Sequence, residues 1–156
     1  EAEPIGEHPH VIVAPPDHPL ADRRLPLLAL ADEVFLVREL GSGTRALTEK
    51  LLAAADVVPR IGMEIHSNET IKQAVMAGLG IALLSAHTVA AELADRRVVT
   101  LDIEGLPAMR EWFLVKHAEK RLLPAASGLW RFLANRGADY LPQLPAQRPR
   151  LPVSSR

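Results

Sequence analysis

A glycine-containing turn at residues 41–46 carries the strongest chemical signal in this sequence. It follows an apolar run that predicts a strand, precedes a helical pattern, and reads Gly41, Ser42, Gly43, Thr44, Arg45 and Ala46. Glycines let the backbone approach an anion, and the start of a helix presents unpaired N–H groups to it. The Ser42 and Thr44 hydroxyls and the Arg45 guanidinium are within reach of the same ligand. The turn therefore predicts an anion-binding site.

Two other interpretations of this turn remain open. Its glycines match the G-x-G-x-x-G/A fingerprint of dinucleotide-binding folds, and Glu64 lies at about the right distance downstream to bind a ribose. Alternatively, it is an ordinary tight turn in which Thr44 caps the helix and Arg45 is solvated. The Lys-Ser/Thr pair of a phosphate-binding P-loop is absent from the turn.

A second polar junction, at residues 66–70, also follows a predicted strand and opens a helix. Ser67, Asn68 and Glu69 stand at its centre, where Ser67 can cap the helix and Glu69 suits the positive end of its dipole. Ligands of parallel sheets gather at the carboxyl ends of the strands. We therefore expect both junctions to face one crevice, although simple capping explains Ser67 equally well.

Catalytic and metal-binding patterns are poor. Ser85 and His87 lie close together, but no G-x-S-x-G elbow surrounds the serine. His8 and His10 form only a weak metal pair, and no H-E-x-x-H or cysteine-based site exists. The basic run at residues 116–121 is explained by a solvated turn, or it meets an anionic ligand at the crevice. The sequence predicts no catalytic residue, no metal and no resident cofactor, and therefore no enzyme.

Alternating strand and helix patterns position these junctions. Glycines at 78 and 80 end the helix that opens at Ser67. The predicted strands are 10–14, 33–38, 60–65, 81–84, 98–101 and 111–115, and the predicted helices are 44–55, 67–78, 87–94 and 124–135. Residues 1–9 contain Pro4 and Pro9 and predict a loose lead-in. The order of these elements predicts an α/β fold with a parallel sheet flanked by helices.

Composition excludes several classes of protein. The 156 residues carry a net charge of −1, which provides no electrostatic footprint for nucleic acid. Aromatic residues are only 4% of the chain, which argues against a stacking platform for bases. No apolar run is long enough for a membrane span and no signal peptide opens the chain, so we expect a cytoplasmic protein.

Four longer stretches together resemble a known family. They are residues 11–21 (VIVAPPDHPLA), 35–45 (FLVRELGSGTR), 68–85 (NETIKQAVMAGLGIALLS) and 96–107 (RRVVTLDIEGLP). Over roughly residues 5–140 the chain resembles the effector-binding domain of LysR-type transcriptional regulators. Residues 38–45, 67–78 and 105–113 are most similar to regulators of the RuBisCO, or Calvin-cycle, operon.

This resemblance implies a periplasmic-binding-protein-like fold with two Rossmann-like lobes joined by crossing strands. Residues 1–14 would be a remnant and crossover of the first lobe, and residues 15–80 the second lobe. Residues 81–140 would be a return crossover, at Ile81–Leu84, followed by the C-terminal part of the first lobe, and residues 141–156 a Pro-rich mobile tail. The first lobe would be incomplete, because its opening strands and helices are missing. The N-terminal winged helix-turn-helix of the family, which precedes this domain, would be missing too.

The resemblance also implies a ligand-sensing function. The effector would be a sugar bisphosphate, a phosphoglycolate-like acid or NADPH, held by Gly41–Arg45 and Ser67–Glu69. A homodimer or homotetramer would bind DNA only through the absent N-terminal domain, with no role for a membrane. Two alternatives remain: a small NAD(P)-dependent oxidoreductase built on the 41–46 turn, which lacks a recognisable catalytic pair, and an extracytoplasmic solute receptor, which needs an export signal.

Overall fold

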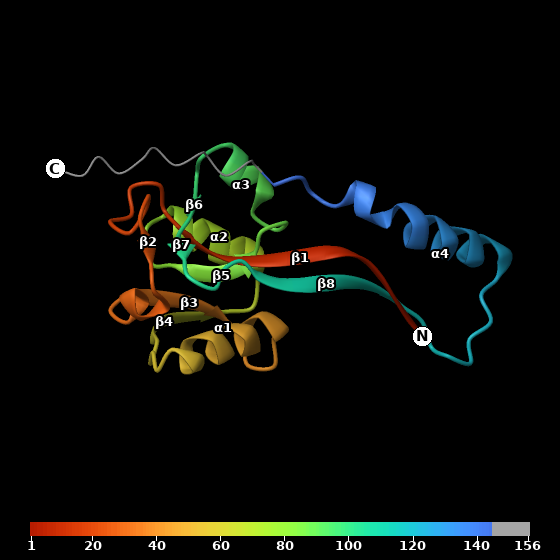
Figure 1. Cartoon of the computed structure of the whole chain (residues 1–156), viewed down its shortest axis with the longest axis horizontal. Coiled ribbons are helices and arrows are strands. Elements are labelled where there is room, and N and C mark those ends of the chain that lie inside the picture. The colour runs from red at the N-terminus through yellow and green to blue at the C-terminus, as the bar shows by residue number, and fades with distance from the viewer. Residues whose placement is uncertain (145–156) are drawn as a thin grey trace.

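A strand of 13 residues near the start of the chain, which pairs with three other strands, organises the structure. The computed structural model describes residues 1–144 (Figure 1). Its elements are β1 (Ala2–Ala14), β2 (Arg24–Leu25), η1 (Leu27–Leu30), β3 (Val34–Arg38), α1 (Gly43–Ala54), β4 (Arg60–Ile65), α2 (Asn68–Met76), β5 (Ala82–Ser85), α3 (Ala90–Ala94), β6 (Val99–Thr100), β7 (Asp102–Ile103), β8 (Ala108–Val115), α4 (Pro124–Arg136) and η2 (Gly137–Tyr140). The Pro-rich tail predicted for residues 141–156 falls mostly outside the described residues.

The C-terminal half of β1 lies inside a compact lobe, which contains β3, β4, β5, β6, α1 and α2. There it pairs antiparallel with β5, from His10 opposite Ser85 to Val13 opposite Ala82, and with β6 at Val13 and Ala14. β3 joins the same sheet through a parallel bridge between Phe35 and Ile81, and β4 pairs parallel to β3. The predicted parallel arrangement is therefore correct for β3, β4 and the start of β5, but β1 and β6 make the complete sheet mixed.

The side chains of this sheet alternate between two cores. On β3, Leu36 belongs to a cluster with Ile71 and Val75 of α2, whereas Phe35 and Val37 belong to a cluster with Leu52 of α1. Because successive side chains of a strand point to opposite faces, α1 and α2 cover opposite faces of the sheet. Ile71, Ala74 and Val75 of α2 are buried at the spacing of one helix face.

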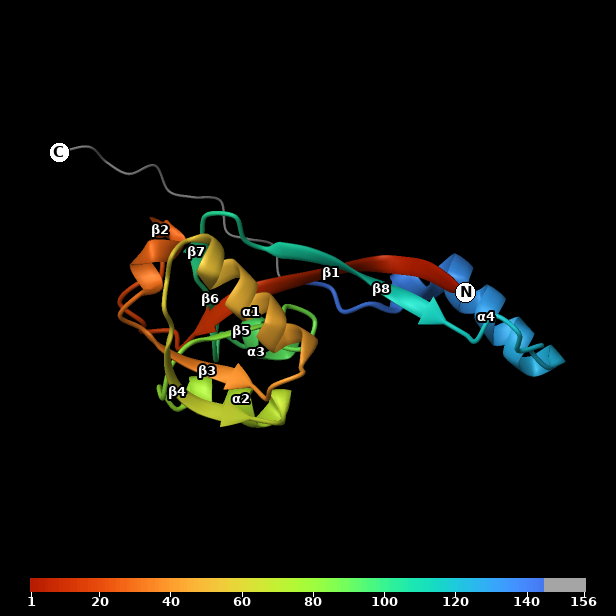
Figure 2. The same ribbon diagram turned by 90° about the horizontal axis from the view of Figure 1, so that it is seen from below.

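The N-terminal half of β1 leaves the lobe and forms a two-stranded ribbon with β8 (Figure 2). Its register runs from Ala2 opposite Val115 to His10 opposite Ala108. The prediction of a loose lead-in over residues 1–9 is wrong. The strand tolerates the prolines because a proline lacks the backbone N–H but keeps its carbonyl as an acceptor. The Pro9 carbonyl accepts a hydrogen bond from the Ala86 N–H.

The strand that returns beside β1 is β8, which differs from the prediction that Ile81–Leu84 is the return crossing. Residues 81–84 lie instead in the middle of the lobe, with Ile81 and Leu83 in one core cluster and Ala82 and Leu84 in the other. An apolar run of this kind is expected for any strand buried on both faces, so the pattern alone did not identify the crossing strand.

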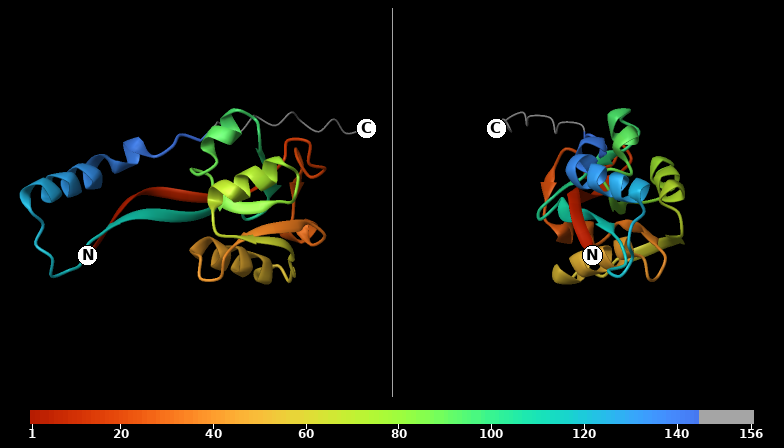
Figure 3. Two further views of the ribbon diagram at one scale, coloured as in Figure 1. Left: turned by 180° about the vertical axis from the view of Figure 1, so that it is seen from behind. Right: turned by 90° about the vertical axis from the view of Figure 1, so that its right-hand side faces the viewer.

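Helix α4 packs against the far end of the ribbon, away from the lobe (Figure 3). It begins at Pro124 as predicted, but none of its residues is buried. Its apolar residues Leu129 and Phe132 remain 59% and 45% exposed. Helix α3 is shorter than predicted because a turn, in which Thr88 donates to the Ser85 carbonyl, occupies residues before it. No helix among the described residues is long and apolar enough to cross a membrane.

Gly80 is required where β5 approaches β3, which generates a test of the fold. A Cβ at Gly80 would lie 2.5 Å from the Val34 carbonyl oxygen, whereas a Cβ at Gly128 in α4 would meet no atom within 4 Å. We expect Gly80→Ala to lower the free energy of unfolding by roughly 1–3 kcal/mol, as overpacking does. Gly128→Ala should raise it by about 0.5–1 kcal/mol through helix propensity. Urea denaturation measures both, and equal stability of the two variants would contradict this packing.

Candidate functional site

Two helix N-termini lie at the carboxyl edge of the lobe's sheet. β3 leads into α1 and β4 leads into α2, and the two strands are parallel neighbours. Parallel strands end at the same edge of a sheet, so both helices begin there. The structure thus brings the two predicted junctions, Gly41–Arg45 and Ser67–Glu69, to one side of the lobe.

The N-terminus of α1 has no acceptor of its own. Gly41 takes a left-handed conformation with φ of +89°, and the helix begins at Gly43 with Ser42 in the N-cap position. The Ser42 side chain accepts no hydrogen bond from the helix, and its first turn contains no acidic residue. The alternative in which Thr44 caps the helix is wrong, because Thr44 lies inside the first turn. The first N–H groups of α1 therefore keep the partial positive charge that attracts an anion.

The N-terminus of α2 is already satisfied by the protein. The Ser67 hydroxyl accepts a hydrogen bond from the Thr70 N–H at 3.3 Å, as predicted for a cap. The Glu69 carboxylate contacts Lys72 at 2.7 Å and accepts a hydrogen bond from Gln73, and these contacts lower the pKa of Glu69. Its negative charge in the first turn makes α2 a weaker anion site than α1.

Arg38, which the sequence did not single out, connects the two junctions. Its guanidinium binds both carboxylate oxygens of Glu39, at 2.7 and 2.8 Å, and donates to the Asn68 side-chain oxygen at 2.7 Å. The hydrogen bonds from Arg38 lower the pKa of Glu39 to about 2. Arg38 therefore attaches the end of β3 to the start of α2, and its charge is already compensated.

Arg45 is buried, and its Nε and Nη1 atoms are engaged by protein partners. It donates to Glu49 at 2.5 Å and to the Arg38 carbonyl at 3.1 Å, and it lies 3.4 Å from a Glu64 oxygen. Only 8% of the residue is exposed. Glu64, the candidate ribose carboxylate, is engaged by the same guanidinium. A direct contact between Arg45 and an effector stays a prediction.

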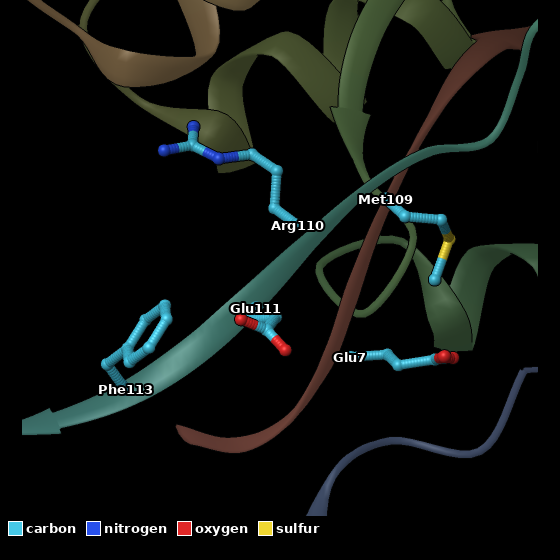
Figure 4. Close-up of a pocket in the computed structure, with 5 residues that line it drawn as sticks. All are labelled: Glu7, Met109, Arg110, Glu111 and Phe113. Carbon is cyan, nitrogen blue, oxygen red and sulfur yellow. The ribbon is translucent and has the colours of Figure 1, made fainter. Parts of the chain in front are cut away.

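Arg110 of β8 approaches the N-terminus of α1 from the ribbon. A Cβ built on Gly43 would lie 3.5 Å from the Arg110 Nη1 atom. Within residues 1–144, no hydrogen bond or ion pair engages the Arg110 guanidinium. A hollow of about 470 Å³ on the ribbon meets this site at Arg110, whose side chain points away from Glu7 and Met109 (Figure 4). Arg110 was missed because it follows no local motif and reaches α1 only through the pairing of β8 with β1.

The other candidate groups lie apart from the two junctions, and some of them have structural partners. His87 accepts a hydrogen bond from the Trp112 indole N–H at 3.1 Å, and the buried Ser85 hydroxyl has no partner. No group of three metal-binding side chains occurs in the described part of the chain. In the basic run, Lys116 pairs with Glu1 at 2.6 Å and lies 5.7 Å from the ring centre of Trp130. None of these residues lies with the junctions as a catalytic set.

Comparison with known proteins agrees with the resemblance read from the sequence. Residues 1–138 match the family profile described as the LysR substrate binding domain. The chain is 55% identical over 148 residues to the HTH-type transcriptional regulator CbbR of Xanthobacter flavus, covering 93% of this chain and 44% of that protein. It is 47% identical over 139 residues to the RuBisCO operon transcriptional regulator of Allochromatium vinosum, covering 88% of this chain and 46% of that protein. The chain spans about half the length of these relatives.

A solved structure gives the same answer for the fold. The regulatory domain of Synechocystis CcmR, in complex with 2-PG, matches with a TM-score of 0.82 and 38% sequence identity, over 86% of this chain and 65% of that one. The predicted α/β, periplasmic-binding-protein-like fold is therefore confirmed. The alternative of an NAD(P)-dependent oxidoreductase receives no support.

The difference between the two helix starts can be tested by removing one hydroxyl from each. Ser67→Ala should lower the free energy of unfolding by about 1 kcal/mol, because it removes the acceptor of the Thr70 N–H. Ser42→Ala should change it by less than about 0.5 kcal/mol, because that hydroxyl caps nothing. Chemical denaturation of the two variants provides the measurement, and a cost at Ser42 equal to that at Ser67 would show that α1 is capped.

Proposed function

Because this chain belongs to the family of LysR substrate-binding domains, we propose that it senses a small anionic metabolite for a regulator of RuBisCO, or Calvin-cycle, genes. The proposal about the controlled genes rests on the relative from Allochromatium vinosum, whose name is RuBisCO operon transcriptional regulator. The relative from Xanthobacter flavus supports the assignment to a transcriptional regulator. For the whole protein, we also propose a winged helix-turn-helix that binds DNA. We propose in addition that the subunits assemble into a homodimer or homotetramer.

The single observation that supports an anionic effector is the pair of positive groups at the start of α1. The free guanidinium of Arg110 and the uncapped helix N-terminus lie beside each other without an acidic partner. Two uncompensated positive groups repel one another, and an anion placed between them would be attracted by both. Their arrangement is therefore suited to a phosphate or carboxylate group.

Three classes of effector carry such a group: sugar bisphosphates, phosphoglycolate-like acids and NADPH. The complex of the similar CcmR domain with 2-PG, 2-phosphoglycolate, favours the second class for this chain. A phosphate between Arg110 and the Gly43 and Thr44 N–H groups is the arrangement that we propose, with Ser42 and Thr44 hydroxyls as further donors.

The position of Arg110 suggests how binding changes the protein. Arg110 belongs to the ribbon, whereas the N-terminus of α1 belongs to the lobe, so a bound anion would connect the two. A ligand shifts a conformational equilibrium only by binding one arrangement more tightly than another. We propose that the anion favours the arrangement in which the ribbon and α1 are close, and that this arrangement changes how paired subunits present their DNA-binding domains.

We infer that this site binds its ligand without transforming it. The groups around it are a guanidinium, backbone amides and hydroxyls, which provide recognition but no general base or nucleophile with an activating partner. Turnover of a nicotinamide cofactor by the chain would contradict this inference.

The proposed site predicts a large effect of Arg110 on effector affinity. Arg110→Gln should weaken the binding of 2-phosphoglycolate about tenfold or more, because a charged hydrogen bond contributes about 1.5–3 kcal/mol. Arg121→Gln removes an exposed guanidinium from the loop between β8 and α4 and serves as the matched control. Isothermal titration calorimetry measures both, and ribulose bisphosphate and NADPH titrated in parallel compare the three effector classes. Unchanged affinity in Arg110→Gln would remove Arg110 from the site.

A further inference from the structure

Three histidines and a tryptophan meet where the ribbon joins the lobe. The His8 ring stacks on Trp112, with ring centres 3.9 Å apart and an interplanar angle of 21°. The ring centres of His10 and His87 lie 4.4 and 5.9 Å from that of His8. We call His8, His10, His87 and Trp112 the histidine–tryptophan cluster. It unites β1, β8 and the turn after β5, so it lies at the joint between the two parts of the molecule.

The contacts and burial of this cluster favour uncharged imidazoles. His87 accepts the Trp112 N–H at its Nδ1 atom, which therefore carries no proton. His10 places Nδ1 3.2 Å from the His8 carbonyl oxygen and donates to it. The Nε2 atom of His8 is buried and has no partner. Burial, followed by electrostatic repulsion from the other two imidazoles whenever they are protonated and from Arg110, lowers the pKa of His8 from 6.5 to about 4.

The cluster adjoins the proposed anion site. Arg110 is directly opposite His8 in the register of the ribbon, so both side chains lie on one face, and Trp112 follows on that same face. Glu7 and Glu111 are directly opposite each other one position along, and their side chains alternate to the other face. The charged groups that face His8 are therefore Arg110 and, through it, the positive end of α1.

We propose that the histidine–tryptophan cluster takes up a proton at His8 when an anion binds between Arg110 and the N-terminus of α1. This inference rests on the proposed function. In the free protein, a charged His8 would face only positive groups. A bound dianion reverses the sign of the local potential, and an opposite charge nearby favours the protonated imidazole.

Linkage fixes the direction of the pH dependence. If His8 binds a proton more tightly in the complex than in the free protein, the complex holds more protons and affinity rises as pH falls. With the free pKa of His8 at about 4, a rise of one unit makes binding about twofold tighter at pH 5 than at pH 7, and a rise of two units about ninefold tighter. Below the free value no further gain occurs, because both states are then protonated.

Trp112 supplies a spectroscopic readout. A protonated imidazole quenches a stacked indole more strongly than a neutral one, so the fluorescence of Trp112 follows the charge of His8. Trp130→Phe removes the other tryptophan and leaves Trp112 as the single emitter. Sulfate is the probe, because it remains a dianion over the whole range from pH 4 to pH 8 and contributes no proton of its own.

The experiment titrates this variant with acid at constant ionic strength, with and without saturating sulfate, and measures sulfate affinity at pH 5 and pH 7. We expect sulfate to raise the midpoint of quenching by about one unit or more. His8→Asn in the same background should bind sulfate with the same affinity at both pH values. The Hε1 resonance of His8, followed by NMR in the unmutated chain, measures the same midpoint if the variant is poorly folded.

The outcomes separate the two proposals. Sulfate binding that depends on Arg110 but leaves the His8 midpoint unchanged would overturn the proton coupling and keep the anion site. Persistence of the full pH dependence in His8→Asn would also overturn the assignment to His8. Absence of sulfate binding at both pH values would contradict the anion site and the coupling together.

Discussion

The hydrogen bonding of β1 to three other strands is the constraint on which the rest of the structure depends. Its C-terminal half is fixed between β5 and β6, in the middle of the lobe, and its N-terminal half is paired with β8. One continuous strand therefore carries the geometry of the sheet out into the ribbon. Because strand pairing sets the register residue by residue, it also decides that Arg110 is opposite His8 and faces the start of α1.

Charge compensation divides the positive groups of the site into two kinds. Arg38 and Arg45 are neutralised by neighbouring carboxylates and hold the two helix starts in place. Arg110 and the first turn of α1 lack such partners within the described residues. The paired arginines hold the backbone in place, while Arg110 and the start of α1 remain available to an anion. An anion can therefore bind at this point without disturbing the ion pairs that support the site. Burial, reinforced by Arg110 at His8 and His10, lowers the pKa of the neighbouring imidazoles.

Local signals in the sequence predicted the lobe well and the joint poorly. The bounds of β3, β4, α1, α2 and α4 agree with the predicted ranges within a few residues, and both Ser67 as a cap and Gly78 as a helix end are confirmed. These features depend on side chains within one turn of the backbone. The extension of β1 through Pro4 and Pro9, and the role of β8 as its partner, depend on pairing between segments about a hundred residues apart, which no local pattern encodes.

The sequence by itself determined the family, the α/β fold and the two polar junctions at the carboxyl edge of the sheet, because these follow from periodicity, capping residues and glycine positions. It did not determine which cation at those junctions is free. Arg45 stands in the motif but is enclosed by Glu49 and Glu64, whereas Arg110, outside every motif, reaches Gly43 unpaired. Only the tertiary structure decided this, since the partner of a long side chain is set by which distant carboxylates the folded chain brings within reach.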